Sequence, residues 1–268
     1  MEIHQAPAAL TACELILDLL QAHEPHCLAV AQLMRAARLF AIQENAVRVA
    51  LTRLTQQGRL SNPARGRYAL PKTSAGRLAE AQGWLARERA QTEWSGNWLG
   101  VSDAEVTPGD KTRWRRHQRA LGLRGFRKLA EGFYLRPDNL HGGVARMHAD
   151  LLELGLAETS PVLGIAALDP PSRQKAGQLW DIPQLEQQYR AMLQSLRRSQ
   201  SAMSGQSPAQ AARESMLLNR EAIGMILRDP LLPPRLMGGD LRSQLVEQVH
   251  RHSEAARQHW KRFLLSDA

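Results

Sequence analysis

The chain has 268 residues, a formal net charge of +9 and a pI of about 10.3, enough chain for one large domain or for two or three small ones. No apolar run approaches the roughly 20 residues of a membrane span, and MEIHQAPAAL lacks the charge pattern of a signal peptide, so we expect no membrane partner. Two cysteines, Cys13 and Cys27, form no CxxC pair, which indicates a cytoplasmic protein without a disulfide scaffold.

Positive charge is concentrated near the N-terminus. Nine basic residues and a single acidic one, Glu44, lie between Ala31 and Leu78, so the remainder of the chain is close to balanced. A charge excess confined to one module is more typical of phosphate binding than of general solubility, and we expect an anionic partner. The nine are Arg35, Arg38, Arg48, Arg53, Arg59, Arg65, Arg67, Lys72 and Arg77.

The first 72 residues predict a winged helix-turn-helix. Apolar spacing indicates helices over residues 10–23, 29–39 and 44–57, the last ended by Gly58. Two short strands flank residues 62–66, with Arg65 and Arg67 at the tip and on the second strand. This order, in which a helix, a turn and a second helix are followed by a basic hairpin, is typical of domains that bind duplex DNA.

The third helix carries the candidate base-reading residues. Val47, Ala50, Leu51 and Leu54 follow the spacing of a core-facing stripe. Arginine binds guanine with two hydrogen bonds, asparagine binds adenine similarly, and threonine or valine contacts the thymine methyl group. Arg65 and Arg67 are expected to reach phosphate or a minor groove. The alternative is a solvated helix face on a module that binds protein. The residues left facing outward are Asn45, Arg48, Val49, Thr52 and Arg53.

Residues 73–92 predict a connecting helix, and residues 93–170 predict a ferredoxin-like middle domain. A strand over residues 94–102, a helix over 108–121 and a hairpin over 126–136 are followed by a helix over 141–154 and a buried strand over 161–168. This β-α-β-β-α-β order is that of the split βαβ arrangement.

Eight basic residues crowd residues 111–128 of the middle domain. They either extend a DNA footprint, hold an anionic ligand such as a coenzyme A ester, or form a solvated cationic helix face with Trp114 turned to the sheet. The eight are Lys111, Arg113, Arg115, Arg116, Arg119, Arg124, Arg127 and Lys128.

Enzyme chemistry finds little support in the sequence. Asp103 follows the first middle-domain strand, but no second carboxylate is placed to complete a metal site, and such a residue is usually a cap. His252 and His259 lack a third ligand nearby in sequence. Walker A, GxGxxG and GxSxG motifs are absent. We therefore expect neither a catalytic nor a metal site, nor a bound cofactor.

Residues 171–268 predict an all-helical C-terminal domain, making the chain a multidomain α+β protein. Pro170-Pro171-Ser172 is expected to act as a linker. Helices are expected over residues 182–199, 208–228 and 239–265, and the prolines of RDPLLPPRL (residues 228–236) break the last two.

Three stretches are too specific to be generic: GFRKLAEGFYLRPDNL (residues 125–140), LWDIPQLEQQYR (179–190) and RESMLLNREAIGMILRDPLLPPRLM (213–237). Together with residues 15–70, including ENAVRVALTRL, they resemble the PaaX family of phenylacetyl-coenzyme A-responsive bacterial transcriptional regulators. The resemblance covers almost the whole chain in the right order. The family differs at the turn before the third helix, where a Gly and a small hydroxyl residue are common and this chain has Ala41 and Gln43.

This resemblance implies a winged helix-turn-helix, a middle domain shaped like the CRISPR-associated nucleases, and a helical C-terminal domain. It implies a homodimeric repressor of an aromatic-compound catabolic operon that binds a palindromic double-stranded operator and leaves it when an aryl-coenzyme A thioester binds. Base-reading roles carry over to Asn45, Arg48, Thr52 and Arg53. An activator, a metal-dependent nuclease and a protein-binding winged module stay open as alternatives.

Arg213 and Arg220 are the candidates for contact with the effector. They lie two turns apart on one predicted helix, where a guanidinium group suits a phosphate. The alternative is that these arginines, with Glu214 and Glu221, form ion pairs that tie the helix to the middle domain.

Overall fold

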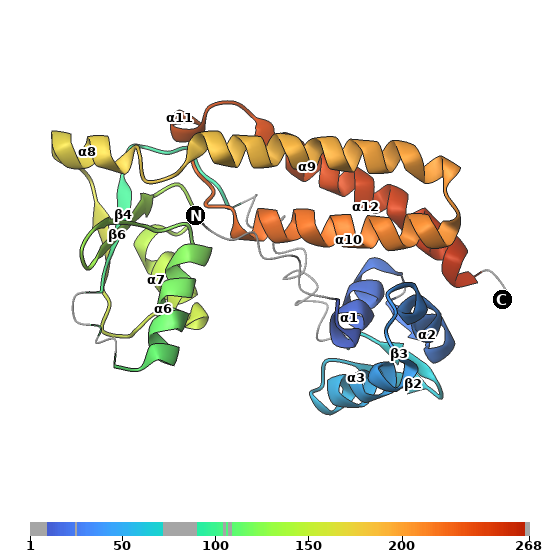
Figure 1. The fold of residues 1–268 in the computed structure, drawn as a ribbon. Coiled ribbons are helices and arrows are strands. Elements are labelled where there is room, and N and C mark those ends of the chain that lie inside the picture. Colours follow the sequence, from blue (N-terminus) through green and yellow to red (C-terminus); the bar gives the residue numbers. More distant parts are fainter. Residues whose placement is uncertain (1–9, 25, 72–89, 104–105, 107–108, 266–268) are drawn as a thin grey trace. The chain divides into compact units, whose positions relative to one another are not determined.

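The computed structural model describes residues 10–24, 26–71, 90–103, 106 and 109–265, drawn as a coloured ribbon in Figure 1. The predicted connecting helix over residues 73–92 falls largely outside them. By its internal contacts the chain divides into two compact units. The first takes its residues from 1–83, 192–223 and 245–268, and the second from 84–191 and 224–244.

The N-terminal part of the first unit (residues 10–71, the N-terminal module) holds three helices and a small antiparallel sheet. Strand order in the sheet is β1-β3-β2, with Leu28 opposite Tyr68. Three-residue β1 was not predicted, because it is too short for an alternating pattern and joins the sheet only through β3. The elements are α1 (Ala12–Ala22), β1 (Cys27–Ala29), α2 (Val30–Leu39), α3 (Glu44–Gln56), β2 (Ser61–Ala64) and β3 (Arg67–Ala69).

A single apolar core joins this module to two C-terminal helices within the same unit. Ala212 and Met216 of α10, and Trp260 and Leu264 of α12, are buried with the core residues of α1, α2 and α3. The rings of Phe40 and Trp260 are stacked with centroids 6.5 Å apart. The module therefore buries apolar surface against α10 and α12 rather than only against itself.

Backbone hydrogen bonds close the turn between α2 and α3. The Ile42 N–H donates to the Ala37 carbonyl at 3.0 Å, and the Ala41 N–H donates to the Arg38 carbonyl at 3.2 Å. This pair is the Schellman motif, whose residue after the C-cap takes a left-handed conformation. That residue is Ala41, with φ 54°, whereas the same motif after α3 places Gly58 there, with φ 66°.

Ala41→Gly should stabilise the module. A Cβ atom in the left-handed region costs roughly 1 kcal/mol, so we expect the free energy of unfolding to rise by about that amount in a urea titration. Gly58→Ala is the matched control and should lower the free energy of unfolding by a similar amount. A Cβ atom at Gly58 would have no other atom within 4 Å, so this substitution adds only backbone strain. A neutral or destabilising Ala41→Gly would contradict the strained-turn interpretation.

Much of the second unit is a four-stranded antiparallel sheet and two helices. Strand order is β5-β6-β4-β7, and α6 and α7 bury Ala120, Leu121, Met147 and Leu151 against Leu99 and Val101 of β4. The elements follow in the predicted order as β4 (Trp98–Ser102), α6 (Lys111–Leu123), β5 (Arg127–Ala130), β6 (Phe133–Pro137), α7 (Gly143–Leu154) and β7 (Val162–Ile165).

Two local predictions were wrong. Strand β7 was expected to be buried, but it lies at a sheet edge beside β4 alone, and Leu163 is 44% exposed. Pro170-Pro171-Ser172 was expected to be a linker, but it opens helix α8 (Pro170–Ala176), whose N-cap is Asp169. Proline fits the first helical turn because the N–H it lacks has no partner there.

The C-terminal region is helical, as predicted. It comprises α8, α9 (Ile182–Ala202), a short 3₁₀ helix η2 (Met203–Gly205), α10 (Pro208–Arg228), α11 (Pro234–Met237) and α12 (Leu241–Leu265). Helices α9, α10 and α12 contribute residues to both compact units.

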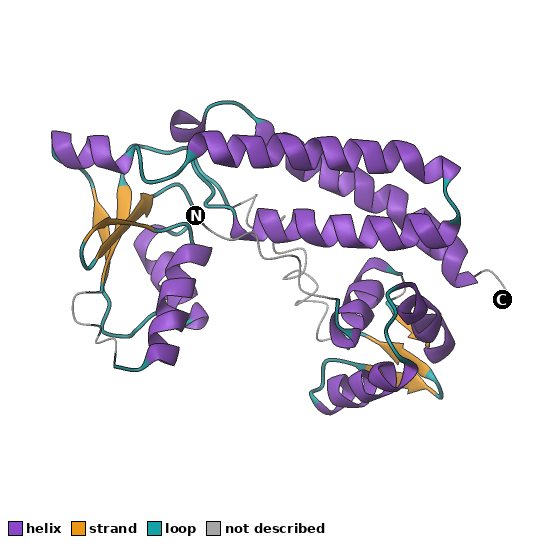
Figure 2. Cartoon of the chain, viewed as in Figure 1, coloured by secondary structure: helices purple, strands orange, loops and turns teal. Residues whose placement is uncertain are grey.

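The predicted α+β class is confirmed in its broad form: many helices, two small sheets and a helical C-terminal region (Figure 2). Within the described residues, no helix has the length and apolar character needed to cross a membrane.

Candidate nucleic-acid interface

Helix α3 presents its predicted outward side chains to solvent. Val47, Ala50, Leu51 and Leu54 are buried in the core of the module. Val49 is 59% exposed, an unusual position for a β-branched apolar residue on a surface helix. The exposed stripe thus combines cationic, amide and methyl groups, which are the groups that read base edges. Its members are Asn45, Arg48, Val49, Thr52 and Arg53.

The first turn of α3 is held by an ion pair with α2. An Arg38 Nη2 donates to a Glu44 carboxylate oxygen at 2.8 Å, and this contact lowers the pKa of Glu44. Gln43, the N-cap, makes no side-chain hydrogen bond to the helix. Arg38 is therefore engaged within the module, whereas Arg48 and Arg53 project from the exposed face.

The basic hairpin follows α3 directly. Ala64 pairs with Arg67 across a two-residue turn made of Arg65 and Gly66, and Gly66 takes φ 70°. Arg65 and Arg67 are exposed. The turn thus points two guanidinium groups away from the core on a short, rigid support.

Apart from Arg38, the exposed arginines of the described part of the module form no ion pair. Among the described residues, no ion pair is formed by Arg48, Arg53, Arg59, Arg65 or Arg67, although other surface arginines of the chain are paired with carboxylates. The structure brings the predicted residues of α3 and of the hairpin into one unit. Their combined chemistry is that of an exposed basic surface, which suits an anionic ligand.

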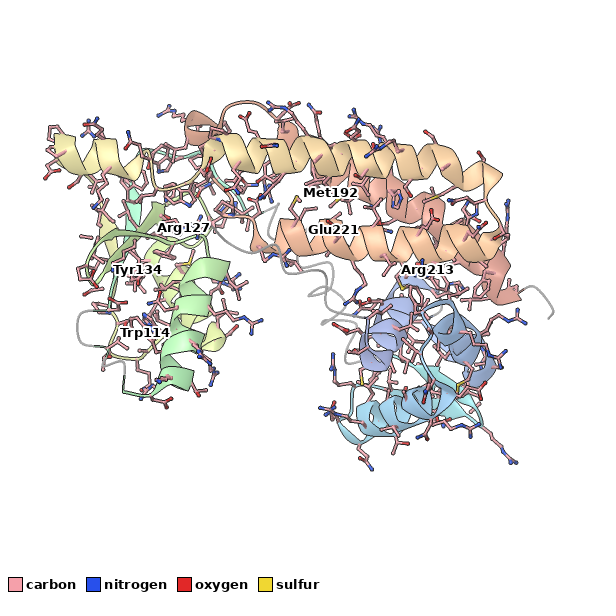
Figure 3. All side chains as sticks on the ribbon, viewed as in Figure 1. Trp114, Arg127, Tyr134, Met192, Arg213 and Glu221 are labelled. Atoms are coloured by element: carbon pink, nitrogen blue, oxygen red, sulfur yellow. The ribbon has the colours of Figure 1, made fainter. Side chains whose placement is uncertain are left out.

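Arg213 and Arg220 lie elsewhere, and both are engaged by the N-terminal module. Arg213 projects from α10 towards the module (Figure 3), and its Nε donates to the Leu39 carbonyl at 3.0 Å. Arg220 donates to the carboxylates of Glu14, at 3.0 Å, and Asp18. Burial raises the pKa of Asp18, although Arg220 opposes this. Ion pairing is therefore the favoured role for Arg220, but with α1 rather than with the middle domain, whereas Arg213 hydrogen-bonds a backbone carbonyl of α2.

Arg220→Ala should lower stability by about 1–2 kcal/mol, because Glu14 and Asp18 lose their shared cation at a half-buried site. Chemical denaturation measures this, with Glu221→Ala, an exposed change one residue away, as the control. Normal stability combined with loss of effector-induced DNA release would instead make Arg220 an effector contact.

The three family-like stretches meet at one buried junction in the second unit. Trp180 Nε1 donates to the Gly125 carbonyl at 3.2 Å, and the Tyr189 hydroxyl donates to Asp229. A Cβ atom at Gly125 would lie 2.7 Å from the Pro230 carbonyl oxygen, so only glycine fits. The conspicuous residues of these stretches thus hold the unit together, and no local spacing in the sequence indicates these pairings.

The same junction includes a buried arginine. Arg136 donates to the Pro137 carbonyl at 2.9 Å and to Asn139 Oδ1 at 2.9 Å. The Asn139 amide in turn donates to the Leu231 carbonyl at 2.8 Å. Residues 228–236 are therefore fixed to the β6 strand by polar groups inside the core.

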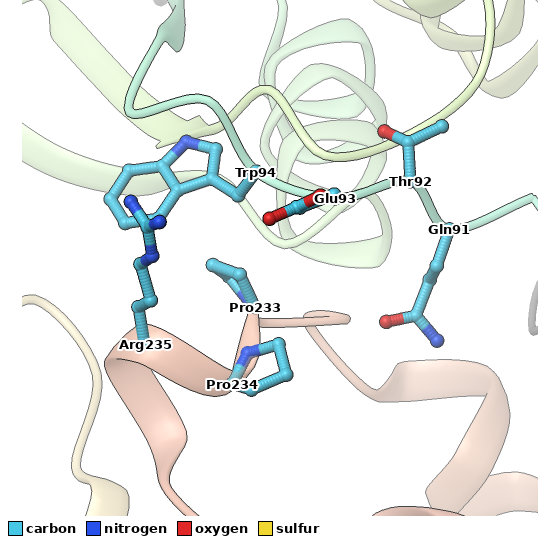
Figure 4. A pocket seen from close by; sticks show the side chains of 7 residues that line it. All are labelled: Gln91, Thr92, Glu93, Trp94, Pro233, Pro234 and Arg235. Atoms are coloured by element: carbon cyan, nitrogen blue, oxygen red, sulfur yellow. The ribbon is translucent and has the colours of Figure 1, made fainter.

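An open pocket of about 580 Å³ lies beside this junction (Figure 4). The Trp94 indole packs edge-on against Trp98, with ring centroids 5.0 Å apart, and the Arg235 guanidinium points towards Trp94. An aromatic surface beside an exposed cation suits a planar aromatic ligand with anionic groups. Sequence reasoning missed it because its walls are far apart in the chain. They are Gln91, Thr92, Glu93, Trp94, Pro233, Pro234 and Arg235.

Asp103, His117 and His252 make structural contacts. Asp103 accepts from Gln118 Nε2 at 3.2 Å and lies 3.7 Å from His117 Nε2. His252 is bonded to Asn219 and Ser199, and burial lowers its pKa to about 4. In the part of the chain that the structure covers, no three His, Cys, Asp or Glu side chains are grouped to hold a metal ion.

Comparison with known proteins gives a family match over part of the chain and structural similarity to solved protein chains. The uncharacterized protein Rv0674 from Mycobacterium tuberculosis is similar in structure, with a TM-score of 0.64 and 24% identity over 96% of this chain and 100% of that one, which shows the fold alone. No curated protein sequence matches the chain. Residues 180–263 match the family of the PaaX-like protein C-terminal domain. This region is therefore similar to the PaaX-like protein C-terminal domain, in agreement with the sequence resemblance over that part of the chain.

Proposed function

We propose that this chain is a DNA-binding transcriptional regulator, acting as a homodimeric repressor. The PaaX-like C-terminal domain supports membership of a family of regulators rather than of enzymes. In this proposal the N-terminal module is a winged helix-turn-helix, α3 reads bases in a major groove, and the β2–β3 hairpin holds the DNA backbone. The sheet and helices of residues 93–170 form a ferredoxin-like domain, and residues 171–268 a helical domain.

The observation that carries the proposal is the exposed face of α3. It places Asn45, Arg48, Val49 and Thr52 along one solvent-facing stripe, and in the described part of the chain the charged member, Arg48, forms no ion pair. The Thr52 hydroxyl donates to the Arg48 carbonyl at 3.1 Å, which fixes the threonine rotamer on this face. Such a stripe has the functional groups needed to distinguish base pairs.

The effector in this proposal is an aryl-coenzyme A thioester, with phenylacetyl-coenzyme A as the first compound to test. Its aromatic part would lie against Trp94, and its anionic part near Arg235. Effector binding changes DNA affinity only if it favours one conformation of the dimer over another.

Selection of bound fragments from the host genome, followed by salt titration of the best site, tests the function. We expect a palindromic site whose half-sites are one helical turn, or a multiple of it, apart, and an affinity that falls steeply with salt. Phenylacetyl-coenzyme A should then release the DNA. A lack of enrichment over random DNA would overturn the proposal and favour a module that binds protein. The position of the site relative to the promoter distinguishes a repressor from an activator.

A further inference from the structure

Helix α6 of the second unit carries an unusual charge. Its thirteen residues, KTRWRRHQRALGL, include five cations and no carboxylate. His117, Ala120 and Leu121 form its buried side, and Trp114 (labelled in Figure 3) stacks on His117 with ring centroids 5.6 Å apart. The cations are left on the exposed side. They are Lys111, Arg113, Arg115, Arg116 and Arg119.

Three of these cations form one row. Lys111, Arg115 and Arg119 are spaced at four-residue intervals, so they lie about 6 Å apart along one side of the helix. Like charges at this spacing oppose helix formation. Arg116 flanks the row and rests against Gly155 at the end of α7.

Three other helices of this chain each contain an internal ion pair. Helix α7 pairs Arg146 with Asp150, α9 pairs Arg190 with Glu186, and α12 pairs Arg251 with Glu247. A merely solvated helix face is expected to mix charges in this way.

Two carboxylates near α6, those of Asp110 and Asp150, bind other groups. Asp110 caps the helix by accepting from the N–H groups of Thr112 and Arg113, and Asp150 is paired with Arg124 and Arg146. Among the residues that the structure describes, no carboxylate makes an ion pair with any of the five cations.

From this charge pattern we infer that the exposed row of α6 is a second DNA-binding surface, which contacts the phosphate backbone of duplex DNA in addition to the contacts proposed for α3 and the hairpin. A row of cations without partners is complementary to the regular row of phosphates on a duplex. Phosphate contacts carry no sequence information, so this surface adds affinity and not specificity. The inference rests on the proposed function in taking duplex DNA as the ligand.

The test is the salt dependence of binding to a random-sequence 40-base-pair duplex by the full chain. Each phosphate contact contributes about 0.9 to the slope of log K against log salt concentration, so Arg115→Ala/Arg119→Ala should reduce the slope by about 1.8 per protomer. Arg115→Lys/Arg119→Lys keeps the charge and should keep the slope. Circular dichroism verifies that each variant is folded.

The matched control is Arg197→Ala/Arg198→Ala, which removes two exposed arginines from α9. Its slope should stay as in the wild type. An unchanged slope for the α6 variant, an equal reduction in the control, or no duplex binding by the wild-type chain would each overturn the inference.

This experiment distinguishes failure of the proposed regulator function from failure of the proposed α6 surface. A reduced slope in a protein that selects no operator would support the α6 surface and overturn the regulator. Operator selection by the wild-type chain, together with an unchanged salt slope in the α6 variant, would support the regulator and overturn the α6 surface. The ratio of operator to random-DNA affinity should be the same in the α6 variant and in the wild type, because only phosphate contacts are removed.

Discussion

Asp229→Ala is expected to lower the free energy of unfolding of the second unit by about 3–5 kcal/mol. Asp229 is 4% exposed and accepts from the Leu231 N–H at 2.7 Å and from the Tyr189 hydroxyl. It also lies 3.1 Å from Nε of Arg242, which is 5% exposed. Removing the carboxylate breaks a buried ion pair from one side, which is costly because the buried Arg242 guanidinium keeps its charge.

Urea unfolding followed by tryptophan fluorescence measures this effect. Glu247→Ala is the control, because its ion pair with Arg251 is exposed on both sides, at 61% and 60%, and should change stability by at most about 0.5 kcal/mol. A loss below roughly 1 kcal/mol for Asp229→Ala would show that the junction relaxes around the missing group. The size of the loss thus reports how rigidly residues 228–236 are held.

Arg48→Ala is expected to weaken operator binding by about 1–3 kcal/mol and to relax selection at one base pair. Arg48 is exposed on α3 and has no ion pair within the described chain, so its removal should leave folding unaffected. Competition binding against operators changed at each position in turn would locate the base pair.

Arg65→Ala serves as the contrasting variant. Its guanidinium group lies on the turn of the hairpin, where phosphate contact is expected, so it should weaken operator and random DNA equally and reduce the salt slope by about 0.9. Arg190→Ala, on α9, controls for loss of one positive charge. Equal loss on operator and random DNA for Arg48→Ala would eliminate its base-reading role.

Hydrogen bonds join the N-terminal module to the C-terminal helices within the first unit. Gln32 and Arg35 of α2 donate to carbonyl groups at the end of α12, at 3.4 Å to Leu264 and 3.2 Å to Phe263. The Leu39 carbonyl, at the other end of α2, accepts from Arg213 of α10. Helix α2 is therefore held at both ends by helices that share residues with both units. A shift of α10 or α12 would therefore displace α2, the helix that precedes α3.

Local sequence patterns determined most elements of this protein. The apolar stripe of α3 and the Gly-marked hairpins were predictable because helix and strand periodicities are properties of a few adjacent residues. The exposed residues of α3 followed from the same stripe, since the residues off the core face must point to solvent. The family resemblance came from longer stretches and was confirmed for residues 180–263.

Only the tertiary structure decided how distant parts are joined. Gly125 is required by the close approach of Pro230, Asp229 contacts Tyr189 and Arg242, and Arg220 pairs with Glu14 and Asp18. None of these partners lies within one or two helical turns of the residue in sequence. The edge position of β7 and the pocket between Trp94 and Arg235 also depend on chain crossings that leave no local periodicity. The sequence gives the type of each side chain. Whether a charged side chain is paired depends on which remote groups the fold brings within hydrogen-bonding distance.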